Sequence, residues 1–317
     1  MNSSKHASVS NPVWLTLLAF AIIYFVWGST FLAIRIGVHE VPPLLLAAMR
    51  FLTAGLVLCG WLLLRGERSP SRREWLSATL LALIIFVFDY GSLFWAEQRI
   101  PSGVAAVMLA TIPAFMALSE IFILRTQKLT IRLALALLIG LAGVAVLMSH
   151  SLNLGDAPID RAGAIALIFA SISWSIASAL SRILPLPQSK VMSSGVQMLA
   201  GGVLLTIASA SFGEFHRFHP STVSRAAWLS LLYLIVFGSI IGFTAYVWLL
   251  HHYSPTKVGT YAYVNPVVAV LFGYFFGSEA LALRTVLGTL FVLASVLLIT
   301  TTRSKQAEAK LVAEDAG

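Results

Sequence analysis

The sequence predicts an all-α integral membrane protein in which ten transmembrane helices form two inverted repeats of five helices. Three observations lead to this fold class: an apolar composition, ten apolar segments of membrane-spanning length, and a set of motifs that occurs twice. Hydrophobic residues make up 58% of the 317 residues and charged residues 11%. A soluble domain of this size could not bury that much apolar surface, so we expect a lipid bilayer around the protein.

A helix needs about 20 mainly apolar residues to cross the hydrocarbon core of a bilayer. Segments of this kind cover residues 14–34, 42–64, 75–95, 101–124, 131–149, 161–182, 190–212, 226–249, 255–277 and 281–301. They are rich in glycine, serine and alanine and lack the strict alternation of barrel strands, which argues against a transmembrane β-barrel. The first segment is longer than the apolar part of a secretory signal and is followed by further spans, so we interpret it as a retained helix.

Residues of the first half recur in the second half 147 or 153 positions later. The pairs are Trp27 with Trp174, Arg35 with Arg182, segment 47–58 with segment 194–205, Trp75 with Trp228, Trp95 with Trp248, and Pro113 with Pro266. Because five helices is an odd number, the second copy starts on the opposite side of the membrane, and the two copies must be antiparallel. Internal duplication of apolar helices is typical of transporters.

The duplication divides the chain into two repeats and three polar segments. Repeat 1 is expected over residues 14–149 and repeat 2 over residues 161–302, and residues 150–160 are expected to form an external loop. Residues 1–13 and 303–317 are polar and are expected to be cytoplasmic tails.

The net charge of +8 is explained by where the basic residues fall in this topology. With the amino terminus in the cytoplasm, 14 Lys and Arg residues lie on the cytoplasmic side and 5 on the opposite side. This bias follows the positive-inside rule and predicts a multi-pass protein of the bacterial inner membrane type with both termini in the cytoplasm. The expected partners are therefore the lipid bilayer and a small-molecule substrate, not a nucleic acid. The oligomeric state is left open, and a monomer is compatible with the sequence.

Ionisable residues inside the predicted spans are candidates for function, because a charge in hydrocarbon is costly without a partner or a wet cavity. Arg50 and Asp89 both fall in the outer half of the membrane, and their repeat mates Gln197 and Gly242 are uncharged. The half that contains the cation also contains the anion, which suggests an Arg50–Asp89 ion pair. This pair could be structural, or Arg50 could hold a substrate carboxylate and Asp89 could take part in proton coupling.

A second set of candidates consists of aromatic and polar residues within the spans. Trp27 and Trp174 lie too deep to be interfacial anchors, and either core packing or the lining of a cavity on opposite sides of the midplane would explain them. The other candidate substrate-binding residues are Thr111, Gln197, Tyr246, Tyr261, Tyr263 and Asn265.

Two prolines and one glutamate complete the candidates. Pro113 and Pro266 occupy matching positions in the repeats, where each is expected to kink its helix and to expose a backbone carbonyl. Paired kinks of this kind point to a transport site, although proline kinks also occur as ordinary packing features. Glu120 is a second carboxylate available for proton coupling, or it could simply reach the interface beside Arg125.

The motifs also support a family resemblance. They are Trp27-Gly28-Ser29-Thr30-Phe31, Met49-Arg50-Phe51, Pro101-Ser102-Gly103-Val104-Ala105-Ala106, Ser173-Trp174, and Tyr261-Ala262-Tyr263-Val264-Asn265-Pro266-Val267 with Glu279. From residue 14 to residue 302, the chain resembles the ten-helix EamA-type branch of the drug/metabolite transporter superfamily. The resemblance implies a permease that exports amino acids or similar small metabolites by alternating access, with a cavity enclosed by helices 1, 3, 4, 6, 8 and 9. Glu279 is matched in the first copy by the neighbourhood of Gln127, which argues against a symmetric role.

Signatures of other protein classes are absent from the sequence. There is no Gly-x-Ser-x-Gly, His-Glu-x-x-His or Walker motif, so we expect neither an enzyme nor an ATP-driven pump. No cofactor and no metal ion are expected. The alternatives to a secondary transporter are a membrane channel and a membrane-embedded small-molecule sensor. Saturable counterflow would distinguish a carrier from a channel, and a sensor would bind its ligand without net movement.

Overall fold

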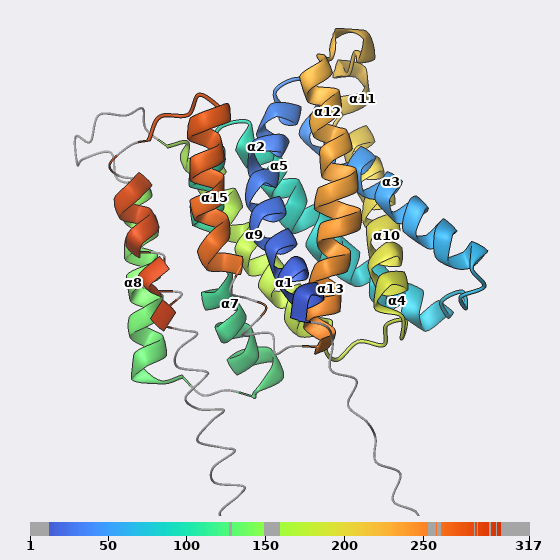
Figure 1. Cartoon of the computed structure of the whole chain (residues 1–317), viewed down its shortest axis with the longest axis horizontal. Coiled ribbons are helices and arrows are strands. Elements are labelled where there is room, and N and C mark those ends of the chain that lie inside the picture. Colours follow the sequence, from blue (N-terminus) through green and yellow to red (C-terminus); the bar gives the residue numbers. More distant parts are fainter. Residues whose placement is uncertain are drawn as a thin grey trace, which may run out of the picture.

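The computed structural model describes residues 13–126, 129–148, 159–252, 258, 261–281, 283, 285–291, 293–295 and 297–298. All regular secondary structure in these residues is helical, as the sequence predicted (Figure 1). Among them, seven helices are long and apolar enough to cross a membrane, and three shorter apolar helices accompany these. The predicted cytoplasmic tails, apart from Val13, and residues 150–158 of the predicted external loop lie outside the described residues.

The seven candidate spans are Val13–Val38, Pro43–Leu64, Arg72–Glu97, Ser102–Leu124, Arg161–Leu180, Lys190–Ser211 and Arg225–Tyr246. Their α-helical elements are α1 (Val13–Ala21), α2 (Trp27–Val38), α3 (Pro43–Leu64), α4 (Arg72–Ala82), α5 (Gly91–Glu97), α6 (Ser102–Leu109), α7 (Ile112–Ser119), α9 (Arg161–Leu180), α10 (Lys190–Ser211), α12 (Arg225–Tyr233) and α13 (Gly242–His252). The remaining α-helices are α8 (Ile131–Met148), α11 (Glu214–Arg217) and α15 (Tyr261–Phe276). The third shorter apolar helix is Thr285–Ser295.

Four of the spans contain a π-helical stretch, in which the helix is locally wider than an α-helix. These stretches are η1 (Ile22–Val26), η2 (Leu83–Tyr90), η3 (Glu120–Leu124) and η5 (Leu234–Ile241). A one-turn 3-10 helix, η4 (Pro220–Thr222), precedes α12. The π-helical stretches matter for the site because Asp89 and Tyr90 end η2 and Trp27 directly follows η1.

The span Ser102–Leu124 is interrupted near its middle. Helix α6 ends at Leu109, and α7 begins at Ile112 with Pro113 in its first turn. Proline lacks the backbone N–H of an interior helical residue, and its ring clashes with the carbonyl four residues earlier. The structure therefore has a break at Ala110 and Thr111 where the sequence predicted one kinked helix.

Helices α3 and α10 touch backbone to backbone. A Cβ atom on Gly55 would lie 2.4 Å from the backbone nitrogen of Leu199, and a Cβ atom on Gly202 would lie 2.4 Å from that of Leu52. Glycine permits this close packing, as is common between membrane helices. Residues 52 and 55 align with residues 199 and 202 in the duplicated segment, so each contact is the repeat image of the other. Because residue numbers rise along one helix as they fall along the other, α3 and α10 are antiparallel.

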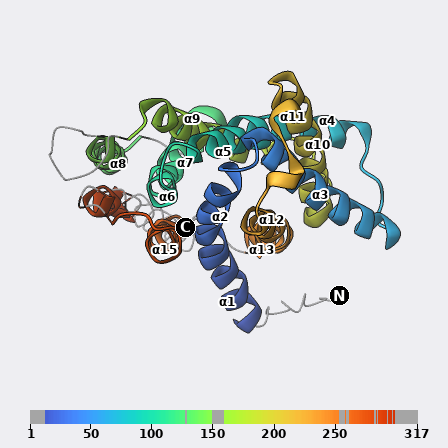
Figure 2. The ribbon, with the colours of Figure 1, turned by 90° about the horizontal axis from the view of Figure 1, so that it is seen from above.

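The first span is central in the helix arrangement. Viewed from above, α2 lies between α15 and α12, with α5 on a third side (Figure 2). Trp27 is the first residue of α2 and therefore lies where several helices converge.

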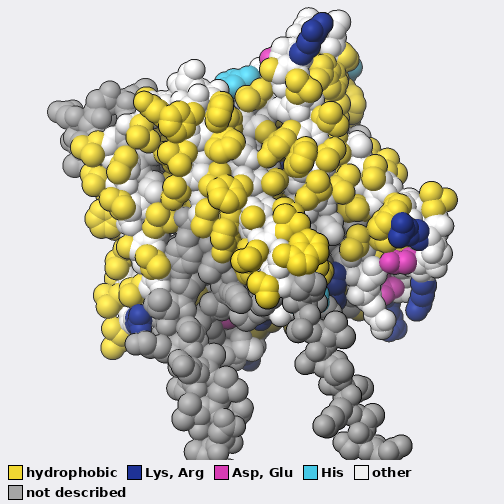
Figure 3. Space-filling model, viewed as in Figure 1, with side chains coloured by type: hydrophobic (Ala, Val, Ile, Leu, Met, Phe, Trp, Pro, Cys, Tyr) yellow, Lys and Arg dark blue, Asp and Glu magenta, His cyan; other side chains and the backbone are white. Residues whose placement is uncertain are grey.

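The outer surface is apolar. Figure 3 shows hydrophobic side chains over the visible face, and Leu64 and Ile131 are among the large hydrophobic residues that are exposed. By contrast, Arg50, Asp89 and Glu97 are buried inside the molecule. A surface of this kind suits contact with lipid, and the buried polar groups require partners or a cavity.

Candidate functional site

A cluster of aromatic rings occupies the centre of the molecule. The ring centroid of Trp27 lies 5.0 Å from that of Tyr246, 5.3 Å from that of Tyr261 and 6.5 Å from that of Trp174. Trp27 is held in place by its indole N–H, which donates to the carbonyl of Gly238 at 3.2 Å. The two repeat-related tryptophans thus lie in one cluster that joins elements from both halves of the chain.

A small cavity of about 70 Å³ adjoins this cluster. Its lining residues are Trp27, Thr30, Phe31, Asp89, Tyr90, Leu93, Ala106, Leu109, Ala110, Ile112, Trp174, Tyr261, Asn265 and Pro266. A cavity of this size holds only a few water molecules, since each requires about 10–15 Å³. It brings together five of the predicted binding residues, namely Trp27, Asp89, Trp174, Tyr261 and Asn265.

A larger cavity of about 390 Å³ lies on the other side of Trp174, which lines both. Its lining includes Glu120, Arg182, Lys190 and Tyr246, together with Gln197 and a series of serines from α9 and α10. The larger cavity is therefore more polar than the smaller one and contains basic groups, whereas the smaller cavity is mainly aromatic and apolar.

Asp89 and Arg50 do not form the predicted ion pair. The Nε of Arg50 donates to Oγ of Ser239 at 2.8 Å, and its guanidinium lies 4.7 Å from the ring centroid of Phe51 and 5.3 Å from that of Tyr90. Tyr90 contacts the Arg50 guanidinium and also lines the small cavity beside Asp89. Arg50 lines neither described cavity, and its contact with a substrate carboxylate stays a prediction.

Asn265 connects α15 to the first span. Its amide Nδ2 donates to the carbonyls of Ile23 at 3.1 Å and Tyr24 at 2.9 Å, both of which belong to η1. Asn265 therefore lines the cavity and also holds two helices together. Its neighbour Pro266 lies inside α15 and lines the same cavity. The predicted contact of Tyr263 with substrate lies outside the described residues, because only the backbone of Tyr263 is described.

Three other predicted residues lie away from the small cavity. Thr111 lines neither described cavity, and its hydroxyl donates to the carbonyl of Met108 at 2.7 Å. Gln197 lines the larger cavity, and its amide donates to the carbonyl of Ser193 at 3.1 Å. Glu120 also lines the larger cavity, where a carboxylate oxygen lies 3.9 Å from Nη1 of Arg182. Both interpretations of Glu120, proton coupling and a reach to the interface beside Arg125, stay predictions.

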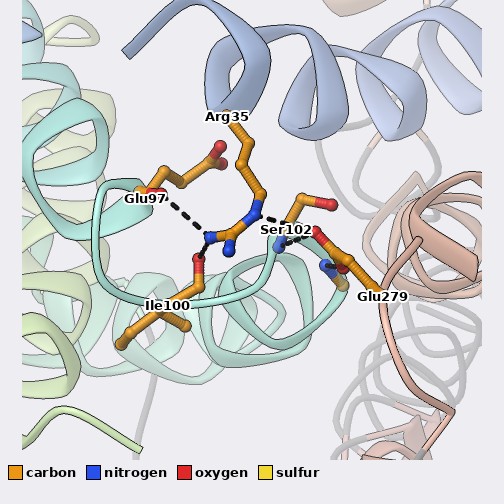
Figure 4. Close-up of polar contacts among 6 residues, drawn as sticks. Arg35, Glu97, Ile100, Ser102 and Glu279 are labelled. Carbon is orange, nitrogen blue, oxygen red and sulfur yellow. Dashed lines mark hydrogen bonds and ion pairs between the residues drawn. The ribbon is translucent and has the colours of Figure 1, made fainter. Parts of the chain in front are cut away.

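Near the carboxyl end of the first span, Arg35 and Glu279 form a partly buried ion pair that sequence reasoning did not assign to the site (Figure 4). Nε of Arg35 lies 3.2 Å from Oε1 of Glu279. The Arg35 guanidinium also donates to the carbonyls of Glu97 and Ile100. These contacts join the end of α2 to the loop between α5 and α6 and to the segment that follows α15.

Glu279 also caps the start of α6. Its two carboxylate oxygens accept the backbone N–H groups of Ser102 at 2.8 Å and Gly103 at 3.2 Å. The first N–H groups of a helix have no partner within it, and a carboxylate there is favoured by the helix dipole. The sequence contained two signals for this arrangement: the recurrence of Arg35 as Arg182, and a proline directly before Ser102.

Glu97 is buried beside this ion pair, and neither of its carboxylate oxygens has a hydrogen-bond partner. In Figure 4 its side chain lies next to that of Arg35. The sequence prediction missed Glu97 because the third apolar segment was expected to end at residue 95, whereas α5 continues to Glu97.

The sequence model that represents the EamA-like transporter family matches this chain over residues 14–149 and 161–301. The chain belongs to the EamA-like transporter family. The resemblance to the EamA-type branch of the drug/metabolite transporter superfamily is thereby confirmed.

Named relatives and a solved structure agree with this assignment. The chain is 41% identical to the uncharacterized inner membrane transporter YedA of Escherichia coli, over 89% of each chain. It is 27% identical to Protein PecM of Dickeya dadantii, over 86% of this chain and 88% of that protein. A crystal structure with 22% identity superposes with a TM-score of 0.63, covering 93% of this chain and 99% of its own, which shows a shared fold. The family, the named relatives and the apolar helices together indicate a multi-pass plasma membrane protein related to transporters.

Proposed function

We propose that this protein is a secondary transporter in which two inverted five-helix repeats give alternating access to a central site. The matches of one family to two successive segments and the antiparallel, repeat-related contacts of α3 and α10 support the inverted repeats. The seven long and three shorter apolar helices of the described residues support a total of ten spans. Both termini then lie in the cytoplasm, in agreement with the bias of basic residues.

The observation that carries this proposal is the difference between the two ends of the central site. On one side, the cavity of about 390 Å³ extends from Trp174 to Arg182 and Lys190. On the other side, the contacts of Arg35 and Glu279 join three separate segments of the chain. In the positive-inside topology, Arg182 and Lys190 face the cytoplasm, so this arrangement corresponds to an inward-facing state.

The two ends are also related by the repeat. Arg182 is the repeat mate of Arg35, and each arginine has a glutamate partner, at 3.9 Å for Glu120 and at 3.2 Å for Glu279. This relation supports Glu120 as the carboxylate of the first repeat that corresponds to Glu279. We expect the Arg182–Glu120 contact to shorten when the inner end closes and the Arg35–Glu279 contact to separate when the outer end opens.

The family resemblance favours amino acids or similar small metabolites as cargo and export as the direction. Asp89 and Glu120 are the carboxylates through which coupling to protons would act, since each lines a cavity. Glu97 is a third buried carboxylate, beside the outer ion pair. The chemistry required of the protein is binding and a change of conformation, without a covalent step.

Counterflow in proteoliposomes tests the proposal. Vesicles that contain the full-length protein are preloaded with members of a metabolite panel, and uptake of the radiolabelled counterpart is followed. Saturable uptake that is stimulated by substrate on the opposite side supports a carrier. Unsaturable flux close to free diffusion would instead indicate a channel, and ligand binding without flux would indicate a sensor; either result overturns the proposal.

A further inference from the structure

We infer that the small central cavity binds the ammonium group of an amine substrate at Asp89. This inference rests on the proposed transport function and names the substrate class of the same site. It replaces the earlier expectation that Arg50 selects a carboxylate.

The charges around the cavity favour a cation. Asp89 is the only Asp, Glu, Lys or Arg among the described residues of the cavity lining. Arg50 lines neither described cavity and donates to Ser239, and Arg35 at the outer end is paired with Glu279. A substrate carboxylate in the small cavity would therefore meet a carboxyl group and no basic side chain.

Asp89 also has unused hydrogen-bonding capacity. The residue is 2% exposed, and its Oδ1 atom has no hydrogen-bond partner. Buried carboxyl oxygens are normally satisfied, because an unmade hydrogen bond in a low-dielectric interior is costly. Two other polar groups of the lining have partners of their own: the hydroxyl of Thr30 donates to the carbonyl of Trp27 at 2.6 Å, and the amide of Asn265 donates to η1. The buried indole N–H of Trp174 has no hydrogen-bond partner among the described residues either, and it does not donate to Asp89. An ammonium group would supply the donor that Asp89 lacks.

The remaining walls suit the same ligand. The rings of Trp27, Tyr90, Trp174 and Tyr261 line the cavity with Asp89. The faces of aromatic rings attract cations, most strongly where water is excluded. A carboxylate among such rings therefore recognises an organic ammonium group by both charge and stacking.

The dimensions define how much of the substrate fits. About 70 Å³ accommodates an ammonium group and a short part of its carbon chain. Trp174 lines both cavities, so the rest of the molecule would extend past it into the larger cavity of about 390 Å³. We therefore expect primary amines with an apolar or aromatic body to bind with the ammonium group innermost.

Three ligands of similar shape and different charge test the inference. Isothermal titration of the full-length protein in detergent at pH 7 measures the affinity for 2-phenylethylamine, 2-phenylethanol and 3-phenylpropanoate. We expect the amine to bind at least about tenfold more tightly than the alcohol, as is usual for a charge-assisted hydrogen bond, and the carboxylate to bind most weakly. Equal affinity for the amine and the alcohol, or tighter binding of the carboxylate, would overturn the inference.

Variants assign the preference to Asp89. In Asp89→Asn, the affinity for the amine is expected to fall at least about tenfold while that for the alcohol changes by less than about twofold. Asp89→Glu keeps the charge and should retain the preference for the amine. The matched control is Asp160→Asn, which changes the N-cap of α9 outside the described cavities and should leave the affinities unaltered. An Asp89→Asn protein that still prefers the amine contradicts the assignment, and thermal unfolding without ligand verifies that each variant is folded.

The counterflow assay separates this inference from the proposed transport function. If binding of the amine depends on Asp89 but no ligand shows counterflow, the binding site is supported and the proposed transport function is overturned. If a metabolite shows saturable counterflow but titration shows no preference for the amine, the proposed transport function is supported and the amine site is overturned.

Discussion

Nε of Arg35 lies 3.2 Å from Oε1 of Glu279, and this contact ties the end of the first span to the segment that follows α15. The same carboxylate accepts the backbone N–H groups that begin α6. One side chain thus connects three elements at the end of the molecule that the basic-residue bias assigns to the outside. Its removal should favour the outward-facing state.

The first prediction concerns opening of this end. In a Cys59→Ser background, a cysteine introduced by Ser102→Cys reports on the space behind the ion pair, because Ser102 is fully buried. Glu279→Gln should increase its labelling by a membrane-impermeant maleimide several-fold, since the charged partner of Arg35 is lost. Glu67→Gln, in the loop after α3, is the control and should have no effect. Unchanged labelling in Glu279→Gln would contradict a gate at this position.

The second prediction concerns the repeat-related pair at the other end. Single replacements Glu120→Arg and Arg182→Glu place like charges together and should slow counterflow. The double replacement restores opposite charges and should recover most of the rate. The Arg182 side chain is 44% exposed, so the effect should be only about fivefold, corresponding to about 1 kcal/mol. If the double variant is as slow as the slower single variant, the two residues do not act as a pair.

The third prediction tests the packing of α3 against α10. Gly55→Ala and Gly202→Ala each place a methyl group 2.4 Å from a backbone nitrogen, which cannot move aside as a side-chain end could. Each replacement should lower the free energy of unfolding by about 1–3 kcal/mol. Gly60→Ala on the same helix is a matched control, because a Cβ atom there meets nothing within 4 Å. Thermal unfolding in detergent measures the difference, and equal stability of all three variants would argue against the close contact.

The fourth prediction concerns pH and the contact between Glu40 and Ser224 outside the spans. The backbone N–H and the hydroxyl of Ser224 donate to the Glu40 carboxylate and hold the pKa of Glu40 below its usual value of about 4.5. A lowered folded-state pKa stabilises the protein above the unfolded pKa, and this stabilisation is lost as the pH falls through the folded pKa. The stability difference between the wild type and Glu40→Gln should therefore be present at pH 7 and shrink below about pH 4.5. Thermal unfolding over this range measures it, and a difference independent of pH would refute the assignment.

Sequence reasoning recovered features that repeat along the chain. The membrane class follows from apolar segments such as 42–64, whose length matches a bilayer, and α3 covers nearly the same residues. The recurrence of Trp27 as Trp174 identified two side chains that meet in the central cluster. Residues 52 and 55 align with residues 199 and 202 at a constant spacing. The contact of Gly55 with Leu199 is the repeat equivalent of the contact of Gly202 with Leu52.

The contacts of individual side chains were beyond the sequence. Asp89 and Arg50 looked like partners because both are charged and close in depth, yet Arg50 contacts Ser239 and the ring of Tyr90. Glu279 was recognised as part of a motif, but its contact with Arg35 joins residues that are far apart in the chain.

The sequence by itself determined that the protein lies in a lipid bilayer, that it is helical and that its helices are duplicated. Hydropathy and repeat spacing are properties of the linear chain. The tertiary structure alone decided which charged side chain lines the small cavity and which segments Arg35 and Glu279 join. An α-helix changes the direction of its side chains by about 100° per residue, so a rotation of the helix about its axis changes which side chains line a cavity and which pack against other helices. That rotation is fixed only in the folded protein, where Trp27, Asp89 and Asn265 from three different spans line one cavity.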